Sequence, residues 1–326
     1  MEKIRWGIMA AGKIADAFAY GLSTLPDAEL VAIGSRSQEK ADAFGEKYNI
    51  PHRHGSYAAL AENPAVDAIY VASPHIFHFN DAMLCLQNGK AVLCEKAFTI
   101  NAKEARKLID FARKKRLFLM EAMWSRFLPS HIRLREMLAQ NVIGELQTMH
   151  AELSFNLPRN PAGRLYAPEL GGGSLLDLGI YPLSLVSMVF GTPDRVTGMA
   201  TMSDTGVDVQ SAAVLGYRDG RLATIHSSMQ TYGNVGAVIV GSEGRIYIDA
   251  PIHKPKYLRL CLNDQPEQII ETPYAENGYQ YEAAEVQRCL RDGRLESDIM
   301  PLDESLALMA IMDELRQQWG LVYPTE

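Results

Sequence analysis

The first 122 residues alternate short apolar runs with stretches in which apolar residues recur at helical spacing. Short apolar runs bounded by turn residues are typical of buried parallel strands, and helices between them are typical of a doubly wound sheet. We therefore predict an N-terminal Rossmann domain over residues 1–122. Its expected strands are Ile4–Met9, Leu30–Gly34, His52–His54, Ala68–Val71, Ala91–Cys94 and Phe118–Ala122. Its expected helices are Lys13–Leu25, Gln38–Tyr48, Tyr57–Glu62, Phe79–Asn88 and Ala102–Lys115.

The pattern changes beyond residue 122, where strand-like runs follow one another with only short turns between them. A turn such as Arg218-Asp219-Gly220 is what an antiparallel hairpin requires. We therefore expect a second domain of the α+β class over residues 123–326, with a largely antiparallel sheet. Its expected strands are residues 145–155, 195–202, 210–217, 222–229, 237–241, 245–248, 257–262 and 268–272. Its expected helices are residues 130–140, 174–190, 281–291 and 302–319, and a loop rich in proline and glycine covers residues 157–173.

The composition fits two globular domains and argues against several classes of protein. Of the 326 residues, 47% are hydrophobic, which is enough for a sizeable core. The net charge of −7 and the lack of a long basic run argue against a nucleic-acid partner. We interpret the one short basic cluster, Arg113-Lys114-Lys115-Arg116, as a helix C-terminus rather than as a phosphate-binding patch.

The cysteines and the apolar runs indicate the compartment. The four cysteines, Cys85, Cys94, Cys261 and Cys289, show no CxxC spacing, which is typical of free thiols in a reducing environment. We find neither a signal-peptide pattern nor an apolar run of membrane-spanning length. We therefore expect a cytoplasmic protein with no membrane partner.

A dinucleotide-binding fingerprint follows the first predicted strand. Ala10 and Ala15 stand at the first and third glycine positions of this motif, and Gly12 keeps the position where the backbone approaches the pyrophosphate. Lys13 and Ile14 open the next helix, whose N-terminal amides suit a phosphate. The alternative is a tight strand–helix turn in a protein that binds no nucleotide.

The end of the second predicted strand indicates which dinucleotide binds. NAD enzymes place a carboxylate there for the ribose 2′-hydroxyl, but the residues here are Ser35-Arg36-Ser37. Arg36 can pair with a 2′-phosphate and the hydroxyls can donate beside it, so we expect NADP as the cofactor. The alternative is a solvated arginine next to a serine that caps a helix.

Candidate chemistry follows the next strands. Strand five ends in Glu95-Lys96, at the carboxyl edge where ligands bind in such a sheet. Ser73, Pro74, His75 and His78 follow strand four, and a glycine run, Gly171-Gly172-Gly173, precedes Asp177 and Tyr181. The spacing of His75 and His78 is that of two metal ligands, but no third ligand accompanies them, so we expect no metal. We place His75 near the nicotinamide ribose and His78 at a helix start.

These segments together resemble the family of glucose–fructose oxidoreductase and inositol 2-dehydrogenase over the whole chain. Glu95-Lys96 matches the family's Glu-Lys-Pro, and Asp177 with Tyr181 matches its Asp and the tyrosine variant of its histidine. Tyr181 and the residues around Trp124 look most similar to the branch of dimeric dihydrodiol dehydrogenase and NADP-dependent D-xylose dehydrogenase. Ala97 departs from the family, which has proline after the lysine.

The resemblance implies roles for these residues and a fold for the second domain. It implies that Lys96 and Tyr181 are catalytic, that Asp177 lies beside them, and that the second domain is built on an open mixed sheet. Ser73, Pro74, His75, His78 and Glu95 are then expected at the cofactor. We expect Trp124, Arg126 and Phe155 at the substrate, although core packing explains Trp124 and Phe155 equally well.

We therefore predict an oxidoreductase that transfers a hydride between NADP and an alcohol or carbonyl of a small sugar or cyclic diol. We place an aldopyranose ahead of an aromatic trans-dihydrodiol. The alternative is an NADP-binding sensor without turnover on the same fold. We also expect a homodimer or higher oligomer assembled through the second sheet, because too few helices remain to cover both of its faces. The apolar residues that this leaves exposed would include Ala237, Ile239, Ile246 and Ile248.

Overall fold

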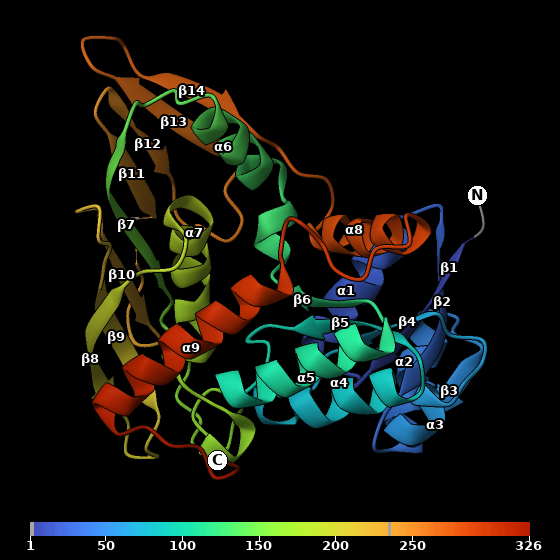
Figure 1. Ribbon diagram of the computed structural model, residues 1–326. Helices are drawn as coiled ribbons and strands as arrows, with labels where there is room; N and C mark the ends of the chain where they lie inside the picture. Colours follow the sequence, from blue (N-terminus) through green and yellow to red (C-terminus); the bar gives the residue numbers. More distant parts are fainter. Residues whose placement is uncertain (1–2, 234–235) are drawn as a thin grey trace. The chain divides into compact units, whose positions relative to one another are not determined.

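The computed structural model describes residues 3–233 and 236–326 and divides into two compact units. The first unit contains residues up to Phe127 together with Ala275–Leu306, and the second contains Leu128–Tyr274 together with Ala307–Glu326. Figure 1 shows the chain with its elements labelled. The units are thus discontinuous in sequence, whereas the division expected at residues 122 and 123 gives two continuous segments.

The first unit is built on a six-stranded parallel sheet in the order β3-β2-β1-β4-β5-β6. This order is that of a doubly wound Rossmann sheet, as predicted. Helices connect the strands, so β4, β5 and β6 are buried throughout, whereas the edge strand β3 is not. The strands are β1 (Ile4–Met9), β2 (Ala28–Gly34), β3 (His52–His54), β4 (Ala68–Val71), β5 (Ala91–Glu95) and β6 (Leu119–Ala122). The helices between them are α1 (Lys13–Ser23), α2 (Gln38–Lys47), α3 (Tyr57–Ala61), η1 (His75–Phe77), α4 (His78–Gln87) and α5 (Ala102–Lys115).

Side-chain caps explain where several of these helices begin and end. Ser37, Ser56 and Asn101 accept hydrogen bonds from the first-turn amides of α2, α3 and α5. Helix α5 ends in three basic residues, and Arg116 caps it in the left-handed conformation with φ 56°. The basic cluster is therefore a helix C-terminus, as predicted.

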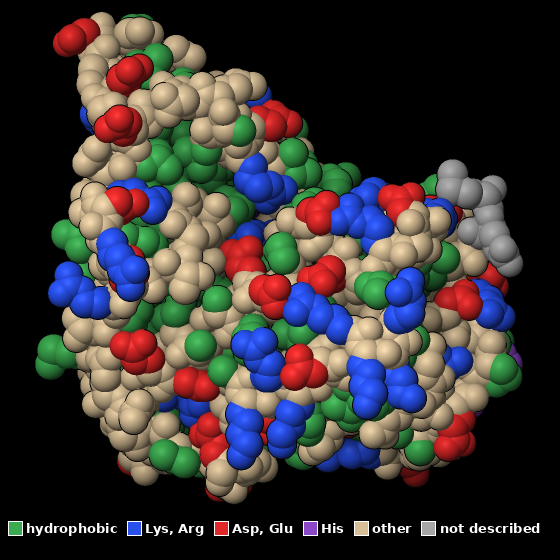
Figure 2. Space-filling view, in the orientation of Figure 1, with side chains coloured by type: hydrophobic (Ala, Val, Ile, Leu, Met, Phe, Trp, Pro, Cys, Tyr) green, Lys and Arg blue, Asp and Glu red, His purple; other side chains and the backbone are tan. Residues whose placement is uncertain are grey.

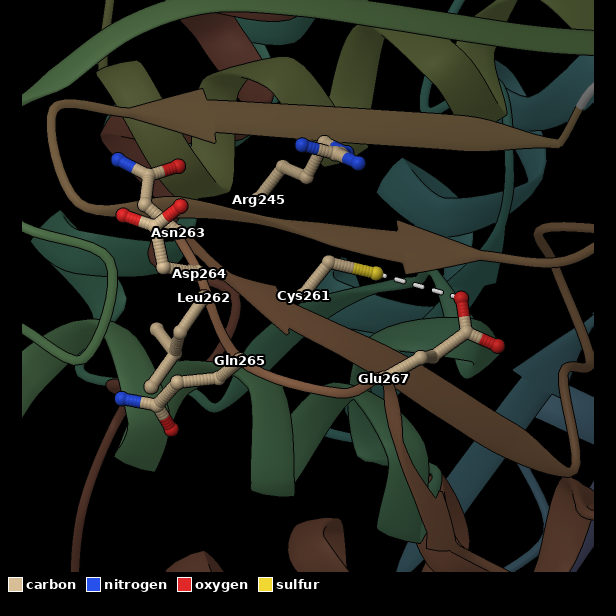
Figure 3. Close-up of a pocket in the computed structure, with 7 residues that line it drawn as sticks. All are labelled: Arg245, Cys261, Leu262, Asn263, Asp264, Gln265 and Glu267. Carbon is tan, nitrogen blue, oxygen red and sulfur yellow. Dashed lines mark hydrogen bonds between the residues drawn. The ribbon is translucent and has the colours of Figure 1, made fainter.

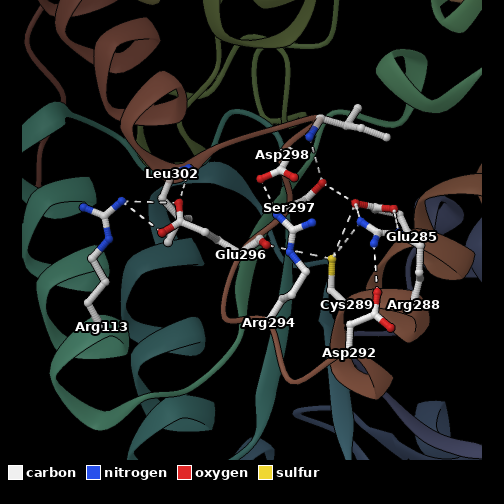
Figure 4. Close-up of polar contacts among 11 residues, drawn as sticks. Arg113, Glu285, Arg288, Cys289, Asp292, Arg294, Glu296, Ser297, Asp298 and Leu302 are labelled. Atoms are coloured by element: carbon white, nitrogen blue, oxygen red, sulfur yellow. Dashed lines mark hydrogen bonds and ion pairs between the residues drawn. The ribbon is translucent and has the colours of Figure 1, made fainter.

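The segment Ala275–Leu306 is fastened to the first unit by polar contacts. It contains α8 (Tyr279–Arg291), and the side-chain amide nitrogen of Asn277 donates to the carbonyl oxygen of Ala17 at 2.7 Å. Arg113 on α5 pairs with Glu296 at 3.1 Å, and the Leu302 amide donates to the same carboxylate. Figure 4 shows this pairing beside a second group of contacts, in which Ser297 and Arg288 both donate to Glu285. These bonds hold the chain between α8 and α9 within the first unit.

The second unit is built on an eight-stranded mixed sheet in the order β14-β13-β12-β11-β7-β10-β9-β8. Only the β7–β10 pair is parallel among the described strands of this sheet, which confirms the largely antiparallel prediction. The strands are β7 (Leu146–Ser154), β8 (Arg195–Met202), β9 (Asp208–Gly216), β10 (Leu222–Ser228), β11 (Ala237–Gly241), β12 (Gly244–Ile248), β13 (Tyr257–Leu262) and β14 (Gln268–Glu271). The helical elements are η2 (Trp124–Phe127) in the first unit, α6 (Pro129–Ala139), η3 (Pro168–Leu170), η4 (Leu175–Gly179), α7 (Ile180–Phe190) and α9 (Leu302–Trp319), which passes from the first unit into the second.

The two faces of this sheet differ, and the structure corrects our assignment of the exposed face. Ala237, Ile239, Ile246 and Ile248 are at most 1% exposed, because they lie on the face that packs against the helices. Successive residues of a strand point to opposite faces, so their neighbours form the other face. We call this other side of the sheet the open face. It carries exposed apolar side chains at Met199, Val214, Leu222 and Ile269.

Surface and core features bear on the compartment. All four cysteines are free and buried, as expected for reduced thiols. The stretch Pro168–Phe190 is long and apolar enough to cross a membrane, contrary to our expectation. However, 89% of its most apolar 18-residue segment is buried inside the protein. Acidic and basic side chains are interspersed on the surface in view in Figure 2. A cytoplasmic location stays a prediction.

Candidate active-site residues

The turn between β1 and α1 has the geometry of a phosphate loop. Ala10 adopts φ 78°, and Gly12 is the N-cap residue of α1 without any side-chain cap. A Cβ atom added at Gly12 would meet nothing within 4 Å, and Gly12 and Lys13 are exposed. No side chain caps the first turn of α1, which contains Ile14, and the space beside Gly12 is open, which fits a bound pyrophosphate.

At the end of β2 the Arg36 side chain is exposed, whereas the hydroxyls of Ser35 and Ser37 accept hydrogen bonds from backbone amides. Ser35 is buried and its hydroxyl accepts from the Ser37 amide at 3.4 Å. Ser37 caps α2, as the alternative interpretation of this segment proposed. Arg36 is exposed, and its guanidinium lies 5.7 Å from the centre of the Phe77 ring. The guanidinium is thus the group at this strand end that can pair with a phosphate.

The residues after β4 are buried. Ser73 and His75 are less than 9% exposed, and Pro74 leads into η1. His78 is fully buried, and its ring nitrogens lie 2.8 Å from the Ala97 carbonyl oxygen and 2.7 Å from that of Ser73. Burial lowers the pKa of His78 to about 4, while its two carbonyl contacts act in the opposite direction. The ring links the ends of β4 and β5. His78 is the first residue of α4, as expected for a residue at a helix start, and its contact with the cofactor stays a prediction.

Glu95 lies in a buried acidic cluster at the end of β5. The Tyr70 hydroxyl donates to its carboxylate, and the Lys96 amide donates to the same carboxylate at 3.2 Å. Glu282 on α8 is fully buried, and burial together with the charge of Glu95 raises the pKa of Glu282 well above its usual range. Glu95 thus holds the backbone of Lys96, and the Lys96–Ala97 peptide bond is cis. Sequence reasoning missed Tyr70 and Glu282, which lie in a buried strand and on a helix far along the chain.

Trp124 and Arg126 lie on the short helix η2 of the first unit. The Trp124 ring stacks on Tyr279 with centroids 4.7 Å apart, and only 4% of its surface is exposed. Arg126 is 2% exposed and forms an ion pair with Glu304 at 2.5 Å. Both side chains therefore support the packing of this unit, and their contact with substrate stays a prediction.

Asp177 and Tyr181 lie on consecutive helical elements of the second unit. Asp177 is in η4, a single π-helical turn, and Tyr181 is in the first turn of α7. Such turns are frequent at functional sites. Arg164, from the loop before the glycines, donates to Asp177 at 2.8 Å. Tyr181 is 9% exposed, so most of its side chain is buried.

An aromatic group surrounds Tyr181 within the second unit. The His253 ring lies 5.3 Å from the Tyr181 ring and 5.8 Å from the Phe155 ring, measured between centroids. Phe155 follows β7 and His253 lies in the loop after β12, and both are half-buried. Phe155 is thus linked to Tyr181 through His253, and its contact with substrate stays a prediction. Sequence reasoning missed His253, because a lone histidine in a loop carries no recognisable motif.

One cavity of this unit lies elsewhere. It has a volume of about 630 Å³ and is found at the start of β12 and the end of β13. Figure 3 shows its lining, where the Cys261 thiol donates to Glu267 at 3.2 Å. None of the predicted site residues lines it. The described residues also contain no group of three or more potential metal ligands.

Comparison with known proteins identifies the family. Residues 4–123 match the profile described as "Oxidoreductase family, NAD-binding Rossmann fold", and residues 131–247 match the "GFO/IDH/MocA C-terminal domain". The chain belongs to the GFO/IDH/MocA family of oxidoreductases. The resemblance inferred from the sequence is therefore confirmed, and the chain is an enzyme rather than a sensor without turnover.

Relatives cover the whole chain. The chain is 40% identical over 329 residues to a trans-1,2-dihydrobenzene-1,2-diol dehydrogenase of Xenopus tropicalis, covering 98% of this chain and 99% of the relative. The enzyme of the same name from Homo sapiens is 36% identical, with 99% of each chain covered. A 3-ketoreductase from Actinomadura kijaniata, solved with NADP and TDP-benzene, superposes with a TM-score of 0.87 at 27% identity, covering 97% of this chain and 98% of that chain. An aldose–aldose oxidoreductase from Caulobacter crescentus, with a TM-score of 0.89 and 23% identity over 97% of each chain, shares the fold.

Proposed function

We propose that this oxidoreductase is an NADP-dependent dehydrogenase of small cyclic diols or sugars. The observation that carries the proposal is the full-length similarity, at 36–40% identity, to enzymes named trans-1,2-dihydrobenzene-1,2-diol dehydrogenase. On this ground we place a trans-dihydrodiol ahead of an aldopyranose, which reverses the order expected from the sequence. The half-buried aromatic rings of Phe155 and His253 beside Tyr181 suit a planar ring better than a sugar bearing hydroxyls all round.

The choice of NADP rests on the end of β2. Arg36 is exposed there, and residues 34–37 contain no carboxylate to accept from a ribose 2′-hydroxyl. A guanidinium can form paired hydrogen bonds with a 2′-phosphate. Contact with the Phe77 ring restrains the guanidinium, which reduces the entropy lost on binding.

The proposed mechanism divides the chemistry between cofactor and protein. When bound, the nicotinamide supplies the hydride acceptor or donor. Tyr181 takes the proton from the substrate hydroxyl, or returns it in the opposite direction. Lys96 stays the second catalytic residue that the family resemblance implies. Asp177 orients a substrate hydroxyl, and Glu95 fixes the backbone that carries Lys96.

We also propose a homodimer formed through the open face of the second sheet. The exposed apolar residues of β8, β9, β10 and β14 lie on that face of a single chain. Exposed apolar side chains on an uncovered sheet face are typical of a subunit interface.

The experiment is an activity screen of the purified chain. It is incubated with NADP⁺ and, separately, with trans-dihydrodiols, aldopyranoses and acyclic hydroxy acids, and nicotinamide absorbance is followed. We expect reduction of NADP⁺ with a cyclic diol or sugar. Turnover with acyclic hydroxy acids alone would contradict the proposal.

A further inference from the structure

Three consecutive glycines precede Asp177, and each has a structural reason. Gly171 and Gly173 adopt φ 71° and 122°, which side-chain-bearing residues rarely adopt. A Cβ atom on Gly172 would lie 2.7 Å from the carbonyl oxygen of Leu165. A Cβ atom on Gly173 would lie 2.4 Å from Oδ1 of Asp208. The run is therefore compressed against its neighbours, and one of them is a carboxylate.

Asp208 is the first residue of β9 and is fully buried. Its Oδ2 accepts a hydrogen bond from the Leu175 amide at 2.7 Å, and Leu175 is the first residue of η4. Its Oδ1 faces Gly173 and has no hydrogen-bond partner among the described residues. Burial raises the pKa of Asp208 to about 6, because the charged carboxylate loses its contacts with water in the interior.

Tyr323 holds the other side of the glycine run. Its hydroxyl donates to the Gly172 carbonyl oxygen at 2.5 Å, and its amide donates to Glu326 at 2.9 Å. The Arg316 guanidinium lies 5.0 Å from the centre of the Tyr323 ring and pairs with Glu326 at 2.7 Å. Tyr323 is thus fixed by its ring, its amide and its hydroxyl.

We propose that Asp208 is a positioning residue for proton transfer: its carboxylate fixes the start of the segment that carries Asp177 and Tyr181, while Tyr323 fixes the turn before it. The segment runs without interruption from Leu175 through η4 into the first turn of α7. A shift at Leu175 therefore moves both side chains, and small displacements of reacting groups slow a reaction strongly. The proposal rests on the role proposed above for Tyr181.

The test compares Asp208→Ala with Asp208→Asn. Alanine removes the acceptor for the Leu175 amide, whereas asparagine keeps an oxygen there without the charge. Asp194→Asn is the matched control, because Asp194 lies in the same unit and bonds Arg218. The readouts are hydrogen exchange of the Leu175 amide in the free enzyme, kcat with a cyclic diol, and the Kd for NADP.

For Asp208→Ala we expect Leu175 exchange about 10- to 100-fold faster, the scale of one hydrogen bond to a charged group. We expect kcat to fall by at least about tenfold while the Kd for NADP changes less than about twofold. Asp208→Asn should restore most of kcat, and Asp194→Asn should leave all three readouts at native values. If Asp208→Ala fails to fold, Tyr323→Phe replaces it and should also accelerate Leu175 exchange.

Two results separate this inference from the proposed function. Unchanged Leu175 exchange and kcat in a folded Asp208→Ala enzyme would overturn the role of Asp208, even if Tyr181→Phe abolishes turnover. Native turnover by Tyr181→Phe would instead overturn the role of Tyr181. Faster Leu175 exchange in Asp208→Ala would still support the positioning of the segment by Asp208.

Discussion

Arg164 forms an ion pair with Asp177, with Nη1 2.8 Å from Oδ1, and joins an exposed loop to a buried carboxylate. The Arg164 side chain is 57% exposed, whereas that of Asp177 is 8% exposed. The loop residues 157–173 are therefore connected directly to the segment that carries Tyr181. A loop that contacts a buried site residue is a common means of shaping a substrate site.

Replacing Arg164 with methionine should reduce kcat/KM for the diol by about tenfold, because a positioned charged partner is worth about 1.5 kcal/mol or more. The Kd for NADP should stay within about twofold of the native value, since Arg164 lies outside the Rossmann unit. Steady-state kinetics and a fluorescence titration measure the two quantities. Arg159→Met is the control, because Arg159 lies in the same loop as Arg164 and forms an exposed ion pair with Asp204. This variant should change neither kcat/KM nor the Kd for NADP. An equal loss in both variants would refute a specific role for Arg164.

Replacing Arg36 with alanine should weaken NADP binding by about 1.5–3 kcal/mol, the scale of one charged hydrogen-bond partner. NAD lacks the 2′-phosphate, so its affinity should hardly change. Isothermal titration of both cofactors against both proteins measures the difference. If the native chain binds NAD and NADP equally well, the assignment of the 2′-phosphate to Arg36 is wrong.

The open face of the second sheet should form the dimer interface. Val214 lies on β9 and is 42% exposed in a single chain. Glutamate at this position would place a charge in the interface, where desolvation opposes association. Light scattering should give twice 36.1 kDa for the native chain and 36.1 kDa for Val214→Glu. The surface variant Lys103→Glu should behave as the native chain, and a native monomer at micromolar concentration would contradict the proposal.

Glu121 should make unfolding depend on pH. It is fully buried in β6, and burial raises its pKa from 4.5 to about 7. Between these values the folded state retains a proton that the unfolded state has lost, so stability falls as the pH rises through this range. The loss is on the order of 3 kcal/mol at neutral pH relative to pH 4.5. Denaturant unfolding at several pH values should show a flatter profile for Glu121→Gln, and an unchanged profile would exclude Glu121 as the cause.

The hydrophobic periodicity predicted the strands and helices well, because the residues that mark each of them lie within it or next to it in the sequence. Strand β1 and helix α5 begin and end at the expected residues, since a buried strand and an asparagine-capped helix are marked by their own residues. The open sheet face was assigned wrongly. Alternation shows which residues of a strand share a face, but not which face the helices cover.

The site was predicted only where a motif marks it. Gly12, Lys96 and Tyr181 belong to patterns that are continuous in sequence. Asp208, on strand β9, accepts from the Leu175 amide, and His253, in a loop, lies beside the Tyr181 ring. Neither residue stands at a recognisable spacing from Tyr181 in the sequence. Contacts of this kind depend on register and packing, which one sequence does not display.

The most direct test of this account is the turnover of Tyr181→Phe with a cyclic diol at saturating NADP⁺, measured beside Lys96→Met. Phenylalanine keeps the ring that packs on His253 and removes only the hydroxyl. We predict a fall in kcat of about 10²- to 10⁴-fold, the usual contribution of a positioned acid–base group. The Kd for NADP should be retained, and Lys96→Met should lose at least as much turnover. A Tyr181→Phe enzyme with near-native kcat would remove Tyr181 from the mechanism.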